Sequence, residues 1–128
     1  PDRRPHQPAR YAAECDATAR AIAARLADLG VNVPWRSTFQ SKFGPDRWLR
    51  PATIDTMARL PREGVRRVVV ANPGFMADCL ETIYEMDVLN ADAFYKAGGQ
   101  TFRRIGCPDA DAGAAILAEL RGALRPFE

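Results

Sequence analysis

The sequence predicts an α/β fold in which helices cover a parallel sheet. Apolar, β-branched runs alternate along the chain with stretches whose apolar residues recur at helical spacing. Strands that alternate with helices pair in parallel through right-handed crossovers. The predicted order is helix, strand, helix, strand, helix, strand, helix, which gives a three-layer arrangement with a thin sheet. We therefore expect a further strand to precede Pro1, so that the first strand of the complete sheet is missing here.

Composition limits the class of protein. The 128 residues, 47% of them hydrophobic, suffice for one domain with a buried core. A net charge of +2 gives no indication of nucleic-acid binding. No apolar run approaches the ~20 residues that cross a bilayer, and no signal peptide is visible. With its excess of alanine and arginine, the chain is expected to come from a bacterial cytoplasm, with at most a peripheral contact to the inner membrane surface.

The first elements are predicted to be a linker, a helix and an extended run. Residues 1–10 contain prolines and show no periodicity, which is typical of a linker. Apolar residues follow helical spacing over 11–29, and Gly30 suits the position after a helix end. Residues 31–40 are then predicted to be extended. The chain does not begin with Met, so we expect it to be a piece of a longer protein.

Helix and strand alternate through the rest of the chain. A second helix is expected to have Pro51 at its first position and to end at Gly64. Residues 65–71 give the clearest strand, apolar enough to be buried on both faces. The remaining predicted elements are a long helix over 77–97, a short strand over 101–107 and a helix over 109–124. The arginine pairs 66–67 and 103–104 are expected to be solvated charges at strand starts.

Three turns of this topology meet at one edge of the sheet. Ligands of open parallel sheets bind outside the carboxyl ends of the strands. The turns at 40–45, 73–78 and 107–109 should therefore form the site. Bulky apolar residues in these turns favour a flat hydrophobic ligand over a sugar or a nucleotide. They are Trp48, Phe75 and Met76, with the alternative that Trp48 packs under its own loop.

The long predicted helix carries a row of carboxylates. On a wheel of 100° per residue, one narrow arc contains Asp78, Glu81, Glu85 and Asp92. The opposite side contains Leu80, Ile83, Tyr84, Ala91, Phe94 and Tyr95. Such a stripe is most often a solvated face. Its position just beyond a strand's carboxyl end favours a second interpretation, in which oxygen ligands pass a divalent cation or a proton along a line.

Cysteines and histidines are too few for a site of their own. Cys15, Cys79 and Cys107 show no CxxC spacing, so we expect reduced thiols and neither a disulfide framework nor a zinc site. The only histidine is His6, in the linker. No glycine-rich phosphate motif is present.

Two long motifs resemble those of the ferrochelatase family. Residues from Phe39 to Thr53 resemble the family pattern "QS+xGPxxWLxPxT", and residues from Pro73 to Glu85 resemble "PxFxxDxxETLxE". The resemblance covers about residues 11–108. By it, the chain is similar to the C-terminal half of a bacterial-type ferrochelatase, and residues 11–128 would form the C-terminal Rossmann-like lobe of a two-lobed chelatase.

The resemblance implies a lyase that inserts Fe(II) into protoporphyrin IX to form haem. The porphyrin would lie between this lobe and an N-terminal lobe that is missing here, so the isolated chain is expected to be inactive. Fe(II) would be a substrate, and no tightly bound cofactor is expected. No cysteine cluster suited to an iron–sulfur centre is present. The family's pocket histidine has no match, and many members have histidine at the position of Cys79.

The resemblance also implies roles for individual residues. Glu81 would take part in metal delivery or accept pyrrole protons, in agreement with its place in the acidic arc, and Glu85 would be the next metal-binding carboxylate outward. A carboxylate such as Glu81 in apolar surroundings tends to a raised pKa. Porphyrin-binding positions would be Trp48, Phe75, Met76 and Cys79. Supporting positions would be Gln40, Ser41, Lys42 and Asp78.

Two rival functions stay open at this point. The first is a half-length chelatase acting on sirohydrochlorin as a homodimer, against which the lack of a strand-borne histidine argues. The second is a non-catalytic tetrapyrrole-binding module, which has no need of carboxylates behind an aromatic wall.

Overall fold

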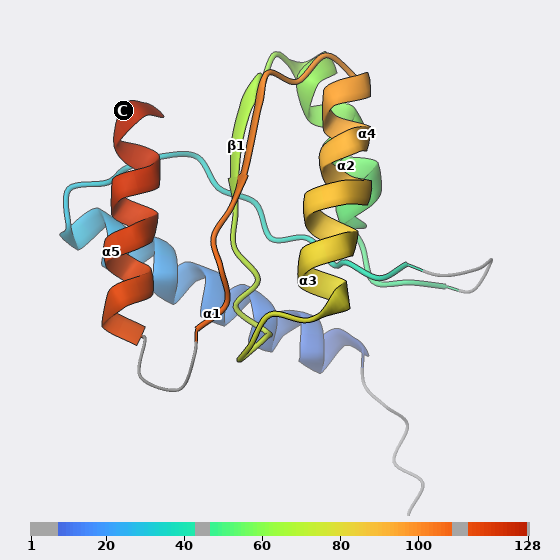
Figure 1. Ribbon diagram of the computed structural model, residues 1–128. Helices are drawn as coiled ribbons and strands as arrows, with labels where there is room; N and C mark the ends of the chain where they lie inside the picture. The colour runs from blue at the N-terminus through green and yellow to red at the C-terminus, as the bar shows by residue number, and fades with distance from the viewer. Residues whose placement is uncertain (1–7, 43–46, 109–112, 128) are drawn as a thin grey trace, which may run out of the picture.

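A computed structural model of the chain describes residues 8–42, 47–108 and 113–127. The fold is α/β, as predicted, and is built around two parallel strands, β1 (Arg67–Val70) and β2 (Thr101–Arg104), with Val68 opposite Phe102 (Figure 1). The helices are α1 (Pro8–Asp28), α2 (Thr53–Arg59), α3 (Leu80–Tyr84), α4 (Ala91–Lys96) and α5 (Gly113–Leu124). Between them lie the 3-10 helices η1 (Leu60–Glu63) and η3 (Arg125–Phe127) and a π-helical segment, η2 (Glu85–Asn90).

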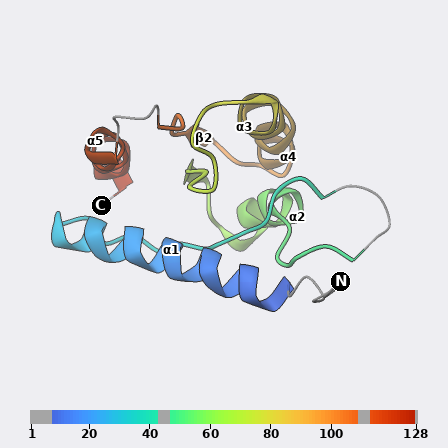
Figure 2. The ribbon, with the colours of Figure 1, turned by 90° about the horizontal axis from the view of Figure 1, so that it is seen from below.

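Helices cover both faces of the sheet and produce three layers (Figures 1 and 2). On one face, α1 and α5 pack against Val69; the buried residues of this cluster are Leu26, Val31, Ile105, Leu120, Ala123 and Leu124. On the other face, α2, η1 and α4 pack against Val68 and Val70 through Met57, Leu60 and Phe94. Successive side chains of a strand point to opposite faces, so β1 supplies both clusters. The strand is half-buried, and not fully buried on both faces as predicted.

The prediction that residues 31–40 form a strand of the sheet is wrong. Among the described residues this run pairs only at Phe39, in an isolated parallel bridge with Ala52. Pro34 has no N–H to donate to a ladder, which disfavours regular pairing. Val31 is nevertheless buried, and Val33 packs beside it in the α1–α5 cluster. The run contributes side chains to the core, and it carries the chain to the loop that begins at Gln40.

The first two helices begin at other residues than predicted. α1 starts at Pro8, inside the predicted linker, and ends before Gly30, whose φ of 82° is the left-handed conformation that glycine favours. α2 starts at Thr53 with the extended Ala52 as its N-cap, so Pro51 lies before the helix and not at its first position. α5 is described from Gly113, so the start predicted at residue 109 lies outside the described residues.

The long predicted helix over 77–97 is interrupted by the π-helical segment η2. The helical region as a whole begins at Leu80 with α3, and the buried residues of α3, η2 and α4 are Thr82, Met86, Asn90, Ala91 and Phe94. The predicted apolar side is therefore wrong in part: Leu80, Ile83, Tyr84 and Tyr95 are 47–73% exposed. A π turn contains more residues than an α turn, so a wheel at one fixed angle misplaces the residues on either side of it.

Gly99, just before β2, is a position where the core leaves no room for a side chain. A Cβ built there overlaps the ring of Phe94, which is fully buried and cannot move away. We expect Gly99→Ala to lower the free energy of unfolding by about 1–3 kcal/mol through overpacking. Gly122→Ala is the matched control, because a Cβ there meets nothing within 4 Å and alanine favours a helix by roughly 0.5–1 kcal/mol. Urea unfolding followed by circular dichroism measures both changes, and equal stabilities would contradict the packing argument.

Candidate functional site

Hydrogen bonds join the turns at the carboxyl ends of the strands. The side-chain Nδ2 of Asn72, just after β1, donates to Oε1 of Gln40 at 2.6 Å. After β2, the backbone N–H of Cys107 donates to Oδ1 of Asp78 at 3.3 Å. The predicted meeting of three turns at one edge of the sheet is therefore confirmed for their described residues.

Gln40 makes the largest number of these connections. Its Nε2 donates to the backbone carbonyl of Glu81 at 2.9 Å and to Oε2 of Glu85 at 3.4 Å. Its Oε1 accepts from Asn72, and its backbone carbonyl accepts from the indole Nε1 of Trp48 at 3.0 Å. One residue thus fixes the loop, the end of β1 and the two helical turns that carry Glu81 and Glu85.

The Glu85 carboxylate is held by the neighbouring serine. Ser41 Oγ donates to Oε2 of Glu85 at 2.7 Å, and the Ser41 backbone N–H donates a second hydrogen bond to Oε1. Ser41 has a φ of 62°, a left-handed conformation that costs an L-residue roughly 1–2 kcal/mol. The two hydrogen bonds to a charged acceptor offset that cost, because bonds of this kind contribute about 1.5–3 kcal/mol each.

The Glu81 carboxylate, in contrast, is exposed. A hydrogen bond from the Cys79 side chain, and then one from its own backbone N–H, hold the pKa of Glu81 below its ordinary value. The prediction of a raised pKa is wrong for this chain, because the carboxylate lies in solvent and not among apolar groups. Glu81 therefore stays ionised at neutral pH.

The predicted porphyrin-binding residues differ in exposure. Trp48 is 40% exposed and lies on the wall of a hollow of about 840 Å³ next to α2. Phe75 is half-buried, and its N–H donates to the Asn72 carbonyl at 3.0 Å. Met76 is 76% exposed. Cys79 is the half-buried N-cap of α3, where its N–H donates to the hydroxyl of Thr82 at 2.9 Å.

Lys42 is not drawn into the hydrogen bonds around Gln40. Its Nζ pairs with Asp55 of α2 at 3.1 Å, on the exposed surface. Its role is therefore to tie the loop to α2, one step away from the carboxylates.

Arg104, at the carboxyl end of β2, is a residue whose role the sequence analysis missed. Its Nη1 lies 2.7 Å from Asp78 Oδ1 and its Nε lies 2.9 Å from Asp87 Oδ1, and its side chain is only 10% exposed. The prediction of a solvated charge is wrong here, because the strand ends at Arg104 and not at residue 107. The available signal was that a charged residue at the carboxyl end of a strand faces the ligand edge.

Asp78 is the acceptor that connects this arginine to the start of α3. Partial burial acts to raise its pKa, but hydrogen bonds from Thr82, Cys107 and Arg104 lower the pKa below the ordinary value. Asp78 thus remains a carboxylate at neutral pH. Its contacts place the first turn of α3, and with it Glu81, against the end of β2.

Neither a metal cluster nor a membrane-spanning helix is found in 8–42, 47–108 and 113–127. Three or more His, Cys, Asp or Glu side chains do not gather anywhere in these ranges as a metal site would need. The helices in the same ranges are too short or too polar to cross a bilayer. The three cysteines are free thiols in the structure.

The fold and the site together define an α/β protein of the chelatase type, with a carboxylate-bearing helix held against the carboxyl edge of a parallel sheet. The model of the family described as "Ferrochelatase" matches residues 1–121. The chain belongs to the ferrochelatase family, and the resemblance seen in its motifs is confirmed.

Several curated proteins of known name are similar to most of the chain. The ferrochelatase of Methylococcus capsulatus is 45% identical over 117 residues, which are 91% of this chain and 35% of that protein. The ferrochelatase of Sodalis glossinidius is 46% identical, with 93% of this chain and 38% of that protein covered. The coproporphyrin III ferrochelatase of Lactococcus lactis subsp. lactis is 43% identical, with 72% and 29% covered. The chain spans roughly a third of the length of these relatives.

We expect Arg104→Gln to lower the free energy of unfolding at pH 7 by about 1–3 kcal/mol, because two partly buried carboxylates lose their cation. Arg103→Gln, on the same strand with an exposed side chain, should change it by less than about 0.5 kcal/mol. Urea unfolding of both variants measures the difference, and equal losses would refute the role of the ion pairs.

The same pair of variants carries a pH test. The folded-state pKa of Asp78 is lowered, so its carboxylate contributes stability above the unfolded pKa of about 3.9, and that contribution is lost as pH falls through the folded-state value. The destabilisation caused by Arg104→Gln should therefore shrink in unfolding measurements made at pH 3. A loss that stays constant from pH 7 to pH 3 would show that the charge of Asp78 is not what holds Arg104.

Proposed function

We propose that the protein carrying this chain inserts Fe(II) into protoporphyrin IX to form haem, and that this chain supplies the carboxylates of the site. Membership of the ferrochelatase family supports the reaction class. The observation that carries the proposal is that Gln40 binds the backbone of Glu81 and the side chain of Glu85 together. The family match also favours this function over a half-length sirohydrochlorin chelatase or a binding module.

Insertion releases two pyrrole protons and replaces them with one dication. The cation must first lose part of its hydration shell, and ionised carboxylate oxygens are suitable replacements for water. The Glu81 carboxylate is exposed and ionised at neutral pH, and it accepts hydrogen bonds from the Cys79 side chain and from its own backbone N–H. We assign it the role of receiving Fe(II). Its lowered pKa favours metal delivery over proton uptake, because an effective base has a pKa near the working pH.

Glu85 has a different task in this proposal. Ser41 and Gln40 donate three hydrogen bonds to its two oxygens, so fewer lone pairs are left for a cation. It acts first as the group that anchors η2 to the loop, and second as the outer carboxylate of the metal path. Gln40 and Ser41 are positioning residues in this scheme. Asp78 is a third positioning residue, because its ion pair with Arg104 holds the start of α3 against the end of β2.

The porphyrin is proposed to lie against the apolar groups next to these carboxylates. Phe75 follows β1 in the same turn as Met76, and Trp48 is fixed by its hydrogen bond to Gln40. A flat macrocycle that covered Met76 and Trp48 would bury apolar surface that is exposed in this chain, at roughly 25 cal/mol per Å². Cys79 lies one residue before α3, between this apolar group and Glu81.

Glu81→Gln tests the assignment of the metal-receiving group. Glutamine keeps the shape and the helix propensity but removes the charge that receives the cation, so kcat for Fe(II) insertion should fall at least roughly a hundredfold. Porphyrin affinity should change little, because the lost interaction belongs to the transition state. The assay follows the porphyrin absorption band on metal insertion by the full-length protein.

Glu85→Gln is the matched comparison, one helical turn away. Its loss in kcat should be much smaller and should show mainly at low Fe(II) concentration. Equal, small losses in the two variants would mean that the acidic row is only a solvated face, and the assignment would fail.

Cys79→Ser should leave most of the insertion activity. Serine is a favoured N-cap, and its hydroxyl replaces the thiol as a donor to Glu81. If this variant abolished insertion in the same assay while its circular dichroism spectrum stayed unchanged, the thiol would have to bind iron directly.

A further inference from the structure

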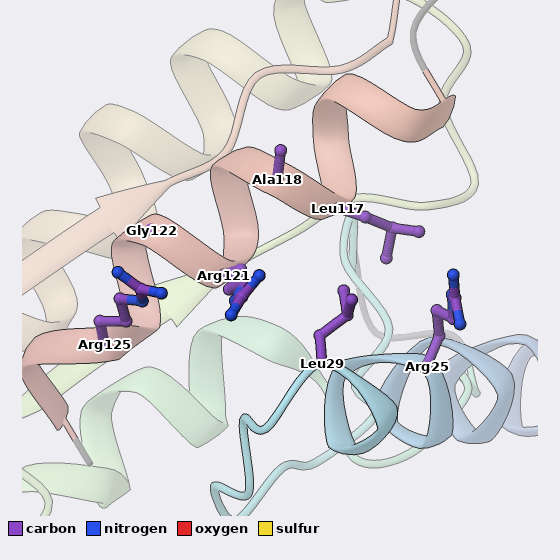
Figure 3. Close-up of a pocket in the computed structure, with 7 residues that line it drawn as sticks. All are labelled: Arg25, Leu29, Leu117, Ala118, Arg121, Gly122 and Arg125. Carbon is purple, nitrogen blue, oxygen red and sulfur yellow. The ribbon is translucent and has the colours of Figure 1, made fainter.

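A second hollow, of about 410 Å³, lies between α1 and α5. Figure 3 shows Arg25 of α1 and Leu29, just after α1, extending toward α5, and α5 together with Arg125 of η3 contributes the rest of the lining. The hollow is on the sheet face covered by α1 and α5, whereas α2, η1 and α4 cover the other face. None of its lining residues takes part in the hydrogen bonds around Gln40, so it is separate from the proposed metal site.

Three arginines line this hollow. Arg121 lies on α5, Arg125 is the first residue of η3, which follows α5 directly, and Arg25 approaches from α1. In the described part of the chain, neither Arg121 nor Arg125 has a carboxylate partner. Among the residues that the structure describes, the carboxylate partner of Arg25 is Asp28, at 3.8 Å, and both side chains are more than half exposed. Such a pair contributes little, so the charge of the hollow is almost uncompensated.

The rest of the lining is apolar. Leu29, just after α1, and Leu117 of α5 lie beside the arginines, together with Ala118 and Gly122. Gly122 has no side chain, and a Cβ placed there meets nothing within 4 Å, so open space reaches the backbone of α5. A volume of 410 Å³ is within the range of about 300–1,000 Å³ that is usual for small-ligand sites.

We propose that this hollow binds an amphiphilic anion, a phosphate or carboxylate head with a short apolar chain. Guanidinium groups bind such heads through paired, charge-assisted hydrogen bonds. The head would lie among Arg25, Arg121 and Arg125, and the apolar chain would lie on Leu29 and Leu117. Neither a free inorganic anion nor a neutral amphiphile satisfies both parts of the lining. The proposal is independent of metal insertion.

Octyl phosphate, used below its micelle concentration, is the probe, and isothermal titration calorimetry on the full-length protein is the measurement. Inorganic phosphate and octyl glucoside are the controls that keep only the head or only the chain. We expect octyl phosphate to bind at least about tenfold more tightly than either control. Arg121→Gln should weaken its binding about tenfold, while Arg103→Gln, on exposed strand surface, should leave it unchanged.

Gly122→Leu tests the cavity separately from the charge. The new side chain fills the hollow and keeps all three arginines, so octyl phosphate binding should be lost and any weak binding of inorganic phosphate should remain. Circular dichroism on each variant shows that the fold is kept. Unchanged octyl phosphate binding in Arg121→Gln or in Gly122→Leu would overturn the proposal, as would the absence of binding to the unmodified protein.

Vesicles then distinguish the source of the anion. If the head group belongs to a lipid, the protein should sediment with vesicles of phosphatidylcholine and phosphatidylglycerol, and Arg121→Gln should reduce that sedimentation. If the ligand is a soluble metabolite, octyl phosphate should bind while these vesicles do not. Either result supports a site for an amphiphilic anion.

Discussion

The carboxamide of Gln40 is the interaction on which the arrangement of the site depends. It donates to the helix that bears Glu81 and Glu85 and accepts from Asn72 at the end of β1, in both cases across more than thirty residues of chain. A carboxamide presents a donor and an acceptor in one rigid plane, so its position is fixed by both partners. The helix then keeps the Glu85 carboxylate bound to Ser41 and leaves the Glu81 carboxylate exposed, which is the arrangement that the proposed role of Glu81 needs.

The packing of the sheet makes this hydrogen bonding possible. Val68 and Val70 pack against the cluster that includes Phe94 of α4, and Val69 packs against the cluster of α1 and α5. The end of β1 is therefore held from both faces of the sheet. The end of β2 is held as well, because Arg104 forms ion pairs with Asp78 and Asp87. The core thus determines where the turns are, and the polar contacts determine which way their side chains point.

The sequence was sufficient for the fold class and for the motifs, because helical and strand periodicities depend on local spacing. It predicted the meeting of the turns, which follows from parallel topology for the two turns after β1 and β2, whereas the turn at Gln40 follows no strand of the sheet and is joined to them by hydrogen bonds. It failed for Arg104, whose burial depends on the residue at which β2 ends, and for the pKa of Glu81, which depends on solvent access. Leu80 and Tyr84 were assigned to the buried side of the helix although they are exposed, because no local sequence pattern predicts the π turn that follows them. Each failure concerns a property set by distant contacts.

The π-helical segment constrains how this region can change in length. Asn90, buried at its end, donates its side-chain amide to the Glu85 carbonyl at 2.8 Å, five residues back. Deleting one residue from this segment would restore a regular α-helix but rotate α3 about 100° relative to α4. Glu85 would then turn away from Ser41 while Phe94 stayed in the core. Surface loops tolerate insertions and deletions, but here the number of residues itself encodes the direction of the carboxylates, so homologues that keep the site must also keep the count.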